Sequence, residues 1–226
     1  MYTTDRRDYS PWRRPLARRA ATSTRLSAYP EARFLLSAAA AAQFPPDVGA
    51  EVAIVGRSNS GKSSAINVIS ARRSLARTSK TPGRTRLVNF FELAAGARLI
   101  DLPGYGYAQG PRAEREQWGE LIEALAPRQS LRGLLLVVDA RRGIMDSDEQ
   151  LLSWARRIAR PVHVLLSKAD QLPQARSEPL LRETLAHLQG IGSAQLFSAR
   201  SGLGLQTARA QLDAWLKKES PDSPLG

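Results

Sequence analysis

The residues with the clearest chemistry lie between Gly56 and Ser63. They read Gly-Arg-Ser-Asn-Ser-Gly-Lys-Ser, which is the spacing of a Walker A phosphate-binding loop. In such a loop, backbone N–H groups and the positive end of a helix dipole surround a phosphate. We expect Lys62 to reach the β- and γ-phosphates and the Ser63 hydroxyl to ligate Mg²⁺. The predicted contacts of a nucleoside triphosphate are therefore Gly56, Arg57, Ser58, Asn59, Ser60, Gly61, Lys62 and Ser63.

A buried strand and a helix must hold this loop in place. The apolar run 52–55 precedes the loop, and 63–69 continues as a helix. Further apolar runs alternate with helical segments and predict strands at 33–37, 51–55, 87–93, 97–101, 133–138, 161–166 and 194–198. This alternation predicts a three-layer α/β fold of the P-loop NTPase type, with helices on both faces of a mostly parallel sheet. Because only 94–96 separates two of these strands, one strand is expected to be antiparallel.

Four amphipathic stripes predict helices around 118–125, 151–158, 180–188 and 205–216. Their tryptophans, Trp118, Trp154 and Trp215, are expected to anchor the core. Asp146 or Ser147 is the expected cap of the second helix, and Ser177 that of the third.

Length and composition narrow the class of protein. The 226 residues predict a basic, disordered arm over 1–30, one domain over 31–219 and a frayed tail over 220–226. The absence of cysteine excludes thiolate metal sites and suits a reducing cytosol, and both histidines, His163 and His187, are expected to be structural. No apolar stretch approaches the roughly 20 residues that span a bilayer. We therefore expect a cytoplasmic protein without membrane contact, and a monomer.

Two further motifs indicate which nucleotide the protein binds. Leu99 to Gly104 is a strand that ends in Asp-x-x-Gly, so Asp101 can hold Mg²⁺ through water while the Gly104 N–H meets the γ-phosphate. The strand 161–166 ends in Ser167-Lys168-Ala169-Asp170. The Asp170 carboxylate can accept both N–H donors of guanine, which adenine cannot offer, and buried mismatch of this kind discriminates strongly. Lys168 is expected to lie along the base, and Phe197-Ser198-Ala199 to touch the guanine oxygen.

Four elements, in this order and spacing, resemble those of a translation-factor-class GTPase. They are the phosphate loop and the segments 101–104, 167–170 and 197–199. Two further stretches, Thr78 to Phe91 and Asp-Leu-Pro-Gly-Tyr-Gly-Tyr-Ala from Asp101, make the chain similar to the EngB (YihA/YsxC) family of bacterial GTPases. The resemblance runs from about Arg33 to Lys217 and leaves out the arginine-rich first 30 residues. It implies a GTPase that assists assembly of the large ribosomal subunit and is needed for normal division and septation.

The resemblance also assigns residues. It implies Mg²⁺ ligation by Ser63 and Thr85, beside Asp101; Thr81 is a rival to Thr85. Its further GTP contacts are Gly83, Arg84, Thr85, Arg86, Leu87, Asp101, Leu102, Pro103, Gly104, Ser167, Lys168, Ala169, Asp170, Phe197, Ser198 and Ala199. Ser167 departs from the threonine usual in the family but keeps the hydroxyl.

Hydrolysis would be in-line attack by water on the γ-phosphate, and we expect Lys62, Thr85 and Gly104 to stabilise the developing charge. Tyr105 stands where many GTPases carry a water-orienting glutamine, so we expect it to turn away and turnover to be slow. Asn59 resembles the K⁺-binding position of potassium-stimulated GTPases; the alternative is that it only stabilises the loop.

Charge points to a polyanionic partner. The net charge is +12, and the stretch 52–91 contains no acid but eight bases. Clustering of this kind beside the switch region predicts RNA docking that is coupled to nucleotide state, hence the large ribosomal subunit or its precursor as partner. Three alternatives stay open at this point: an RNA-binding module that holds GTP with negligible turnover, an ATP-dependent kinase, and a direct role in a division complex.

Overall fold

A seven-stranded sheet forms the centre of the protein, in the order β1-β3-β4-β2-β5-β6-β7. The computed structural model describes residues 29–76, 87–106 and 112–217. β3 runs antiparallel to β1 and β4, and the other described pairings are parallel. The strands are β1 (Arg33–Ala38), β2 (Ala50–Gly56), β3 (Val88–Ala94), β4 (Ala97–Asp101), β5 (Leu131–Asp139), β6 (Val162–Ser167) and β7 (Gly192–Leu196). The predicted fold class, with one antiparallel strand, is confirmed.

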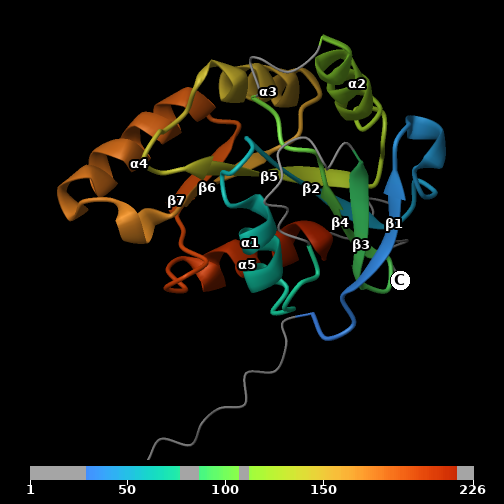
Figure 1. Ribbon diagram of the computed structural model, residues 1–226, viewed down its shortest axis with the longest axis horizontal. Coiled ribbons are helices and arrows are strands. Elements are labelled where there is room, and N and C mark those ends of the chain that lie inside the picture. Colours follow the sequence, from blue (N-terminus) through green and yellow to red (C-terminus); the bar gives the residue numbers. More distant parts are fainter. Residues whose placement is uncertain (1–28, 77–86, 107–111, 218–226) are drawn as a thin grey trace, which may run out of the picture.

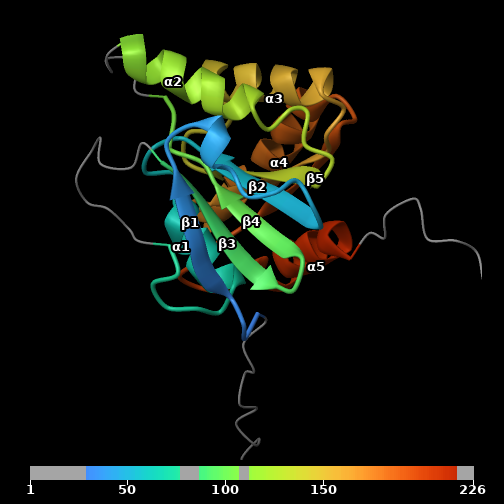
Figure 2. The same ribbon diagram turned by 90° about the vertical axis from the view of Figure 1, so that its right-hand side faces the viewer.

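Five helices cover the sheet within the described ranges: α1 (Lys62–Ile69), α2 (Arg112–Glu123), α3 (Asp146–Arg157), α4 (Gln174–Leu188) and α5 (Leu205–Leu216). Figures 1 and 2 show α1 and α5 on one face and α2, α3 and α4 on the other. Each face has its own apolar cluster, because the central strands are buried on both sides. Because β4, β2, β5, β6 and β7 run parallel, their carboxyl ends lie at the same edge of the sheet.

The predicted aromatic anchors lie in or against the core. Trp154 and Trp215 are buried, and a Cβ on Gly133 of β5 would lie 2.8 Å from the Trp215 ring. Trp118 is half-buried and donates its indole N–H to the Pro103 carbonyl at 3.0 Å. His163 is buried between Ser193 and Gln195, as expected of a structural histidine.

Two predicted helix caps are wrong. The N-cap of α3 is Met145, whose N–H donates to the Asp148 carboxylate at 2.9 Å, so neither Asp146 nor Ser147 caps it. α4 begins at Gln174, directly after Pro173, and therefore contains Ser177 within its first turns. In both cases the helix begins several residues before the first apolar residue of its stripe. The residues of the first turn are mostly polar, so the hydrophobic periodicity does not reveal them.

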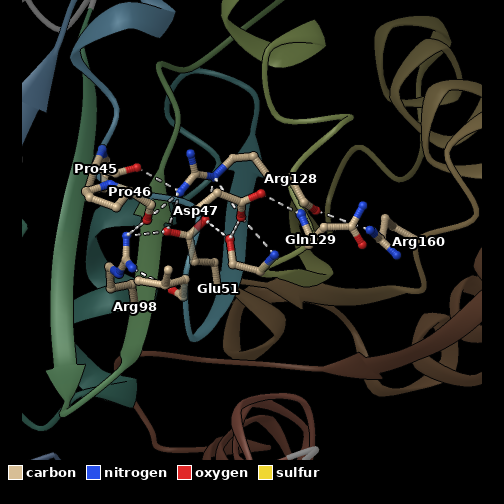
Figure 3. A network of polar contacts seen from close by, with 10 residues as sticks. Pro45, Pro46, Asp47, Glu51, Arg98, Arg128, Gln129 and Arg160 are labelled. Atoms are coloured by element: carbon tan, nitrogen blue, oxygen red, sulfur yellow. Dashed lines mark hydrogen bonds and ion pairs between the residues drawn. The ribbon is translucent and has the colours of Figure 1, made fainter. Parts of the chain in front are cut away.

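A network of charged side chains lies under the amino ends of the parallel strands (Figure 3). Glu51 of β2 is completely buried, accepts from Arg128 Nε and Ser130 Oγ, each at 2.7 Å, and forms an ion pair with Arg98 Nη1 at 2.8 Å. Asp47 accepts the backbone N–H groups of residues 129 and 130, each at 2.9 Å. Both arginines also donate to carbonyls of 45–48. The network ties the segment before β2 to the sheet.

Candidate functional site

The loop between β2 and α1 has the geometry of a phosphate cradle. Gly56 closes β2, and a Cβ there would lie 2.5 Å from the Val137 carbonyl oxygen of β5. Gly61 has φ +98°, a left-handed conformation that favours glycine, and α1 begins at the next residue. The loop therefore directs the N-terminus of α1, whose first N–H groups have no partner within the helix itself, toward the space where a phosphate would bind.

Lys62 and Asp101 meet at this cradle from two elements. Lys62, the first residue of α1, donates to the carboxylate of Asp101 at the end of β4. Asn89 of β3 lies 3.4 Å from the other Asp101 oxygen. Both charged side chains are nearly buried, so the pair replaces much of the water that each would otherwise bind. An incoming phosphate can compete for Lys62 and leave the Asp101 carboxylate available to a hydrated cation.

The residues expected at Mg²⁺ are hard oxygen donors. Ser63 follows Lys62 in the first turn of α1, and Asp101 ends the neighbouring β4. Within the described ranges, no group of three or more His, Cys, Asp or Glu side chains could hold a metal ion. Mg²⁺ is commonly held by one or two protein oxygens together with nucleotide phosphates and water. Ser63 and Asp101 fit that kind of shared site.

The segment after Asp101 is bonded to the phosphate loop. The Ser58 N–H donates to the Tyr105 carbonyl at 3.0 Å, and the Tyr105 N–H donates to the Gly56 carbonyl at 3.4 Å. Leu102 is buried, while Pro103 accepts from the Trp118 indole on α2. These contacts place the Gly104 backbone directly against the loop, where its N–H can respond to a γ-phosphate.

Tyr105 turns away from the cradle, as the sequence led us to expect. Its hydroxyl donates to Asp148 of α3 at 2.7 Å, and its ring packs against Trp118 at a centroid distance of 5.3 Å. Burial raises the pKa of the Tyr105 phenol well above its usual value, and it also raises the pKa of Asp148. The hydroxyl is therefore committed to α3 rather than to a water molecule at the phosphate.

The end of β6 lies beside the same loop. The Ser167 hydroxyl donates to the Ser60 carbonyl. Lys168 Nζ donates to the Asn59 carbonyl at 2.6 Å and lies 2.9 Å from an Asp139 oxygen. Two predicted motifs that lie over a hundred residues apart in the sequence are thus brought together. Asn59 itself has a left-handed backbone, φ +65°, that exposes its carbonyl to Lys168.

Asp139 is a site residue that the sequence reasoning missed. It ends β5, between the ends of β2 and β6, and binds both Lys168 and Arg141. The hydrogen bond from Arg141 is the main reason that the pKa of the Asp139 carboxyl lies well below its usual value. The available signal was its position: an aspartate at the carboxyl end of an apolar parallel strand.

Asp170 and the 197–199 segment form the far side of the site. Asp170 lies in a short 3₁₀ turn, Ala169–Gln171, and its carboxylate accepts from the buried Ser198 hydroxyl at 2.6 Å. The Ala169 N–H donates to the Phe197 carbonyl at 3.1 Å, and Phe197 itself is buried in the core. Ala199 follows and packs partly against the α1 and α5 cluster. The exposed Asp170 carboxylate is thereby oriented from one side and open on the other.

Part of the predicted site cannot be placed. Gly83, Arg84, Thr85 and Arg86, and the rival Thr81, lie outside the described residues. Leu87 is described and exposed, directly before β3. The roles of Thr85 toward Mg²⁺ and of 83–86 toward nucleotide therefore stay predictions.

Comparison with known proteins agrees with this geometry. A family model described as 50S ribosome-binding GTPase matches residues 51–168. The probable GTP-binding protein EngB of Coxiella burnetii is 46% identical over 196 residues, which covers 85% of this chain and 96% of the relative. That of Nitrosococcus oceani is 48% identical over 194 residues, covering 84% and 97%. The chain belongs to the EngB family of GTP-binding proteins.

A solved EngB-family structure, a probable GTP-binding protein engB, supports the fold of this member. It matches with a TM-score of 0.61 and 19% identity, and covers 75% of this chain and all of that one. Among the described residues of this EngB-family chain, no helix combines the length and the apolar character needed to cross a membrane.

Proposed function

We propose that this protein binds guanine nucleotides, hydrolyses GTP slowly and acts as a switch in assembly of the large ribosomal subunit. The observation that carries the proposal is the junction at which Lys168 of the guanine motif donates to the Asn59 carbonyl of the phosphate loop at 2.6 Å. One ligand can then touch both motifs, with its base at Asp170 and its phosphates at Lys62. EngB-family membership supports the same assignment.

In this proposal each motif has one task. The loop from Gly56 to Ser63 holds the phosphates, and Asp170 accepts the two guanine N–H donors while the Ser198 hydroxyl donates to one of the same carboxylate oxygens and orients it. Ser63, Thr85 and Asp101 hold Mg²⁺, which supplies positive charge at the β- and γ-phosphates. Lys62, Thr85 and Gly104 stabilise the charge that develops during hydrolysis. Asn59 is a candidate K⁺ contact, and equal turnover rates in K⁺ and Na⁺ would exclude that role.

The position of Tyr105 supports the proposal of slow turnover. Its hydroxyl is bound to Asp148, so this side chain does not orient a water molecule for attack. This contact also favours the second candidate, an RNA-binding module that holds GTP with negligible turnover. Phosphate release with and without large ribosomal subunits separates the two: stimulation by the subunits supports the switch, and its absence supports the binding module.

The ribosomal partner is supported by charge and by family. The description of the matching family, 50S ribosome-binding GTPase, names a partner that suits a chain of net charge +12. Counterion release from RNA would supply binding energy and make it steeply salt-dependent. We propose a monomeric cytoplasmic protein that binds the large subunit or its precursor more tightly with a GTP analogue than with GDP, and whose loss impairs division and septation.

The decisive test of the nucleotide assignment is Asp170→Asn. Competitive titration of GDP, a GTP analogue and ADP should show a strong guanine preference in the wild-type protein. That preference should fall by at least about tenfold in the variant, because an amide cannot accept both guanine donors. Asp146→Asn, an exposed aspartate at the start of α3, is the matched control. Adenine binding as tight as guanine binding in the wild-type protein would contradict the assignment.

A further inference from the structure

The turn that follows α1 presents two adjacent arginines to solvent. Arg72 and Arg73 are both exposed, and within the described ranges neither guanidinium has a hydrogen bond or an ion pair. Most described arginines are engaged, for example Arg98 and Arg128 with Glu51 and Arg141 with Asp139. The pair is therefore a charged feature that the fold itself does not use.

The backbone under these arginines is fixed. The Arg72 N–H donates to the Asn67 carbonyl at 3.0 Å and the Ala71 N–H to the Val68 carbonyl at 3.2 Å. These two bonds form a Schellman motif, in which Ala71 takes the left-handed conformation, φ +54°. Ser74 is also left-handed, at φ +71°. The two arginines thus stand between two residues whose backbone conformation is uncommon outside glycine and asparagine.

Side chains hold the turn from both sides. The Asn67 amide donates to the Ala76 carbonyl at 2.9 Å and accepts the Ala76 N–H at 2.8 Å. Arg209 of α5 donates to the Val68 and Ile69 carbonyls, each at 2.9 Å. Ile69 and Ala76, before and after the turn, are buried in the core. A turn that is fixed at both ends holds the backbone of its two adjacent arginines in place, so that binding costs little further backbone entropy.

Arg72 and Arg73 are not needed to stabilise the C-terminus of α1, because another arginine already does so. Arginines near a helix C-terminus can stabilise the helix dipole, but Arg209 already supplies a cation to the last carbonyls of α1. α3 gives a direct comparison, because it ends in the same Ala-Arg pair with Ala159 left-handed. There the arginine, Arg160, folds back and donates to the Arg128 carbonyl at 3.2 Å. At α1 the equivalent Arg72 extends into solvent.

The turn lies away from the nucleotide site. It follows the C-terminus of α1, whereas the phosphate loop precedes the N-terminus, so the length of α1, about 12 Å, separates them. Figure 1 shows the end of α1 at the opposite side of the sheet from α2 and α3. Arg72 and Arg73 are therefore not needed for the phosphates of GTP.

We propose that Arg72 and Arg73 form a docking element for the sugar–phosphate backbone of RNA. Guanidinium groups bind phosphate oxygens through paired N–H donors, and two adjacent ones fit consecutive phosphates. The stretch 52–91 around them contains no acid, so no carboxylate close in sequence competes with phosphate. The inference rests on the proposed ribosomal function and adds to it a surface that contacts RNA.

The test compares two double variants that lose the same charge. Arg72→Gln/Arg73→Gln removes the proposed contacts, and Arg176→Gln/Arg182→Gln removes two exposed arginines from α4. Binding is measured to purified large ribosomal subunits and to their protein-free rRNA, over a series of KCl concentrations. We expect the turn variant to bind both at least about tenfold more weakly, with a salt slope smaller by about 1–2, and the α4 variant to bind like the wild type. GDP affinity should be unchanged in both.

Each other outcome has a definite meaning. Equal binding of the turn variant and the α4 variant would overturn the docking element and leave the ribosomal function standing. Wild-type protein that binds neither subunits nor rRNA would overturn the ribosomal partner, and the RNA contact with it. If the turn variant binds subunits more weakly but protein-free rRNA as well as the wild type does, the partner of the turn is an acidic protein surface and not RNA.

A second variant tests the fixed geometry at constant charge. Asn67→Ala removes both bonds to Ala76 but keeps the two arginines. We expect intact GDP binding, which reports folding, together with rRNA binding several-fold weaker than that of the wild type. Wild-type rRNA affinity in this variant would show that charge alone, without the held turn, accounts for binding.

Discussion

The two ends of the sheet use charged side chains in opposite ways. At the amino end, Glu51 is completely buried, and its partners Arg98 and Arg128 are themselves bound to carbonyls of 45–48. At the carboxyl end, Lys62 pairs with Asp101 at a helix N-terminus that no side chain caps within the part of the chain that the structure describes. The amino end is closed on itself, while the carboxyl end keeps binding capacity for a ligand.

The difference shows why buried charge alone does not mark a site. A buried ion pair that is fully hydrogen-bonded contributes little net stability, but removing one member is costly. Such a network can fix the geometry of a segment without any ligand. A site also needs charges that a ligand can reach and reorganise, as Asp170 is reachable beside Ser198.

The largest effect is expected from Glu51→Ala at the closed end. The substitution leaves Arg98 and Arg128 buried without their carboxylate, which should cost about 3–5 kcal/mol of the free energy of unfolding. Urea denaturation measures this change. Glu92→Ala, which breaks the exposed pair with Arg33, is the control and should cost less than about 1 kcal/mol. Similar losses in the two variants would remove the distinction between the closed network and an ordinary surface pair.

A smaller effect on stability is expected from Asp139→Asn at the open end. The change weakens the bonds from Arg141 and Lys168 and should lower the free energy of unfolding by about 1–2 kcal/mol. It should also weaken GDP binding several-fold, because Lys168 loses the carboxylate that orients it.

The same variant tests a pH dependence. The pKa of Asp139 is lowered in the folded protein, so its ionised form stabilises the fold above the unfolded value of about 3.9. That contribution is lost as the pH falls below this value. Thermal unfolding followed from about pH 5 down to about pH 2 should therefore show a shallower decline in Asp139→Asn than in the wild type. Parallel curves would contradict this role of Asp139.

The smallest effect is expected from Tyr105→Phe. Loss of the bond to Asp148 should cost about 1 kcal/mol of unfolding free energy. Single-turnover GTP hydrolysis should stay within about twofold of the wild-type rate, because a hydroxyl that faces α3 contributes nothing at the γ-phosphate. A large fall in rate without a loss of nucleotide affinity would place the phenol at the reacting water and contradict the observed orientation.

Much of the fold could be predicted from the sequence because its signals are local. Apolar runs identified all seven strands of the described sheet, and the three-residue gap before Ala97 predicted the antiparallel strand β3. Helix starts were harder: Met145 and Pro173 precede α3 and α4, and neither matched the usual cap types. At α3 the capping contact comes from Asp148, three residues into the helix, which accepts the Met145 N–H, so the residue type at the N-cap did not reveal the start.

The site was predictable to the extent that its motifs are continuous in sequence. The phosphate loop from Gly56, the Asp101–Gly104 segment and the Lys168–Asp170 segment are short runs at the ends of apolar strands. The sequence by itself therefore determined the nucleotide chemistry, because local spacing sets which backbone and side-chain groups face a phosphate or a base.

Only the tertiary structure decided which charges belong together. Lys62 and Asp101 are 39 residues apart, Tyr105 and Asp148 are 43 apart, and Glu51 and Arg128 are 77 apart. No periodicity links such positions; the order of the strands in the sheet does, because it aligns the ends of parallel strands that are distant in sequence. Tertiary placement also explains why two arginines in equivalent helix-end positions differ. Arg160 lies near the Arg128 carbonyl and donates to it, whereas Arg72 extends into solvent.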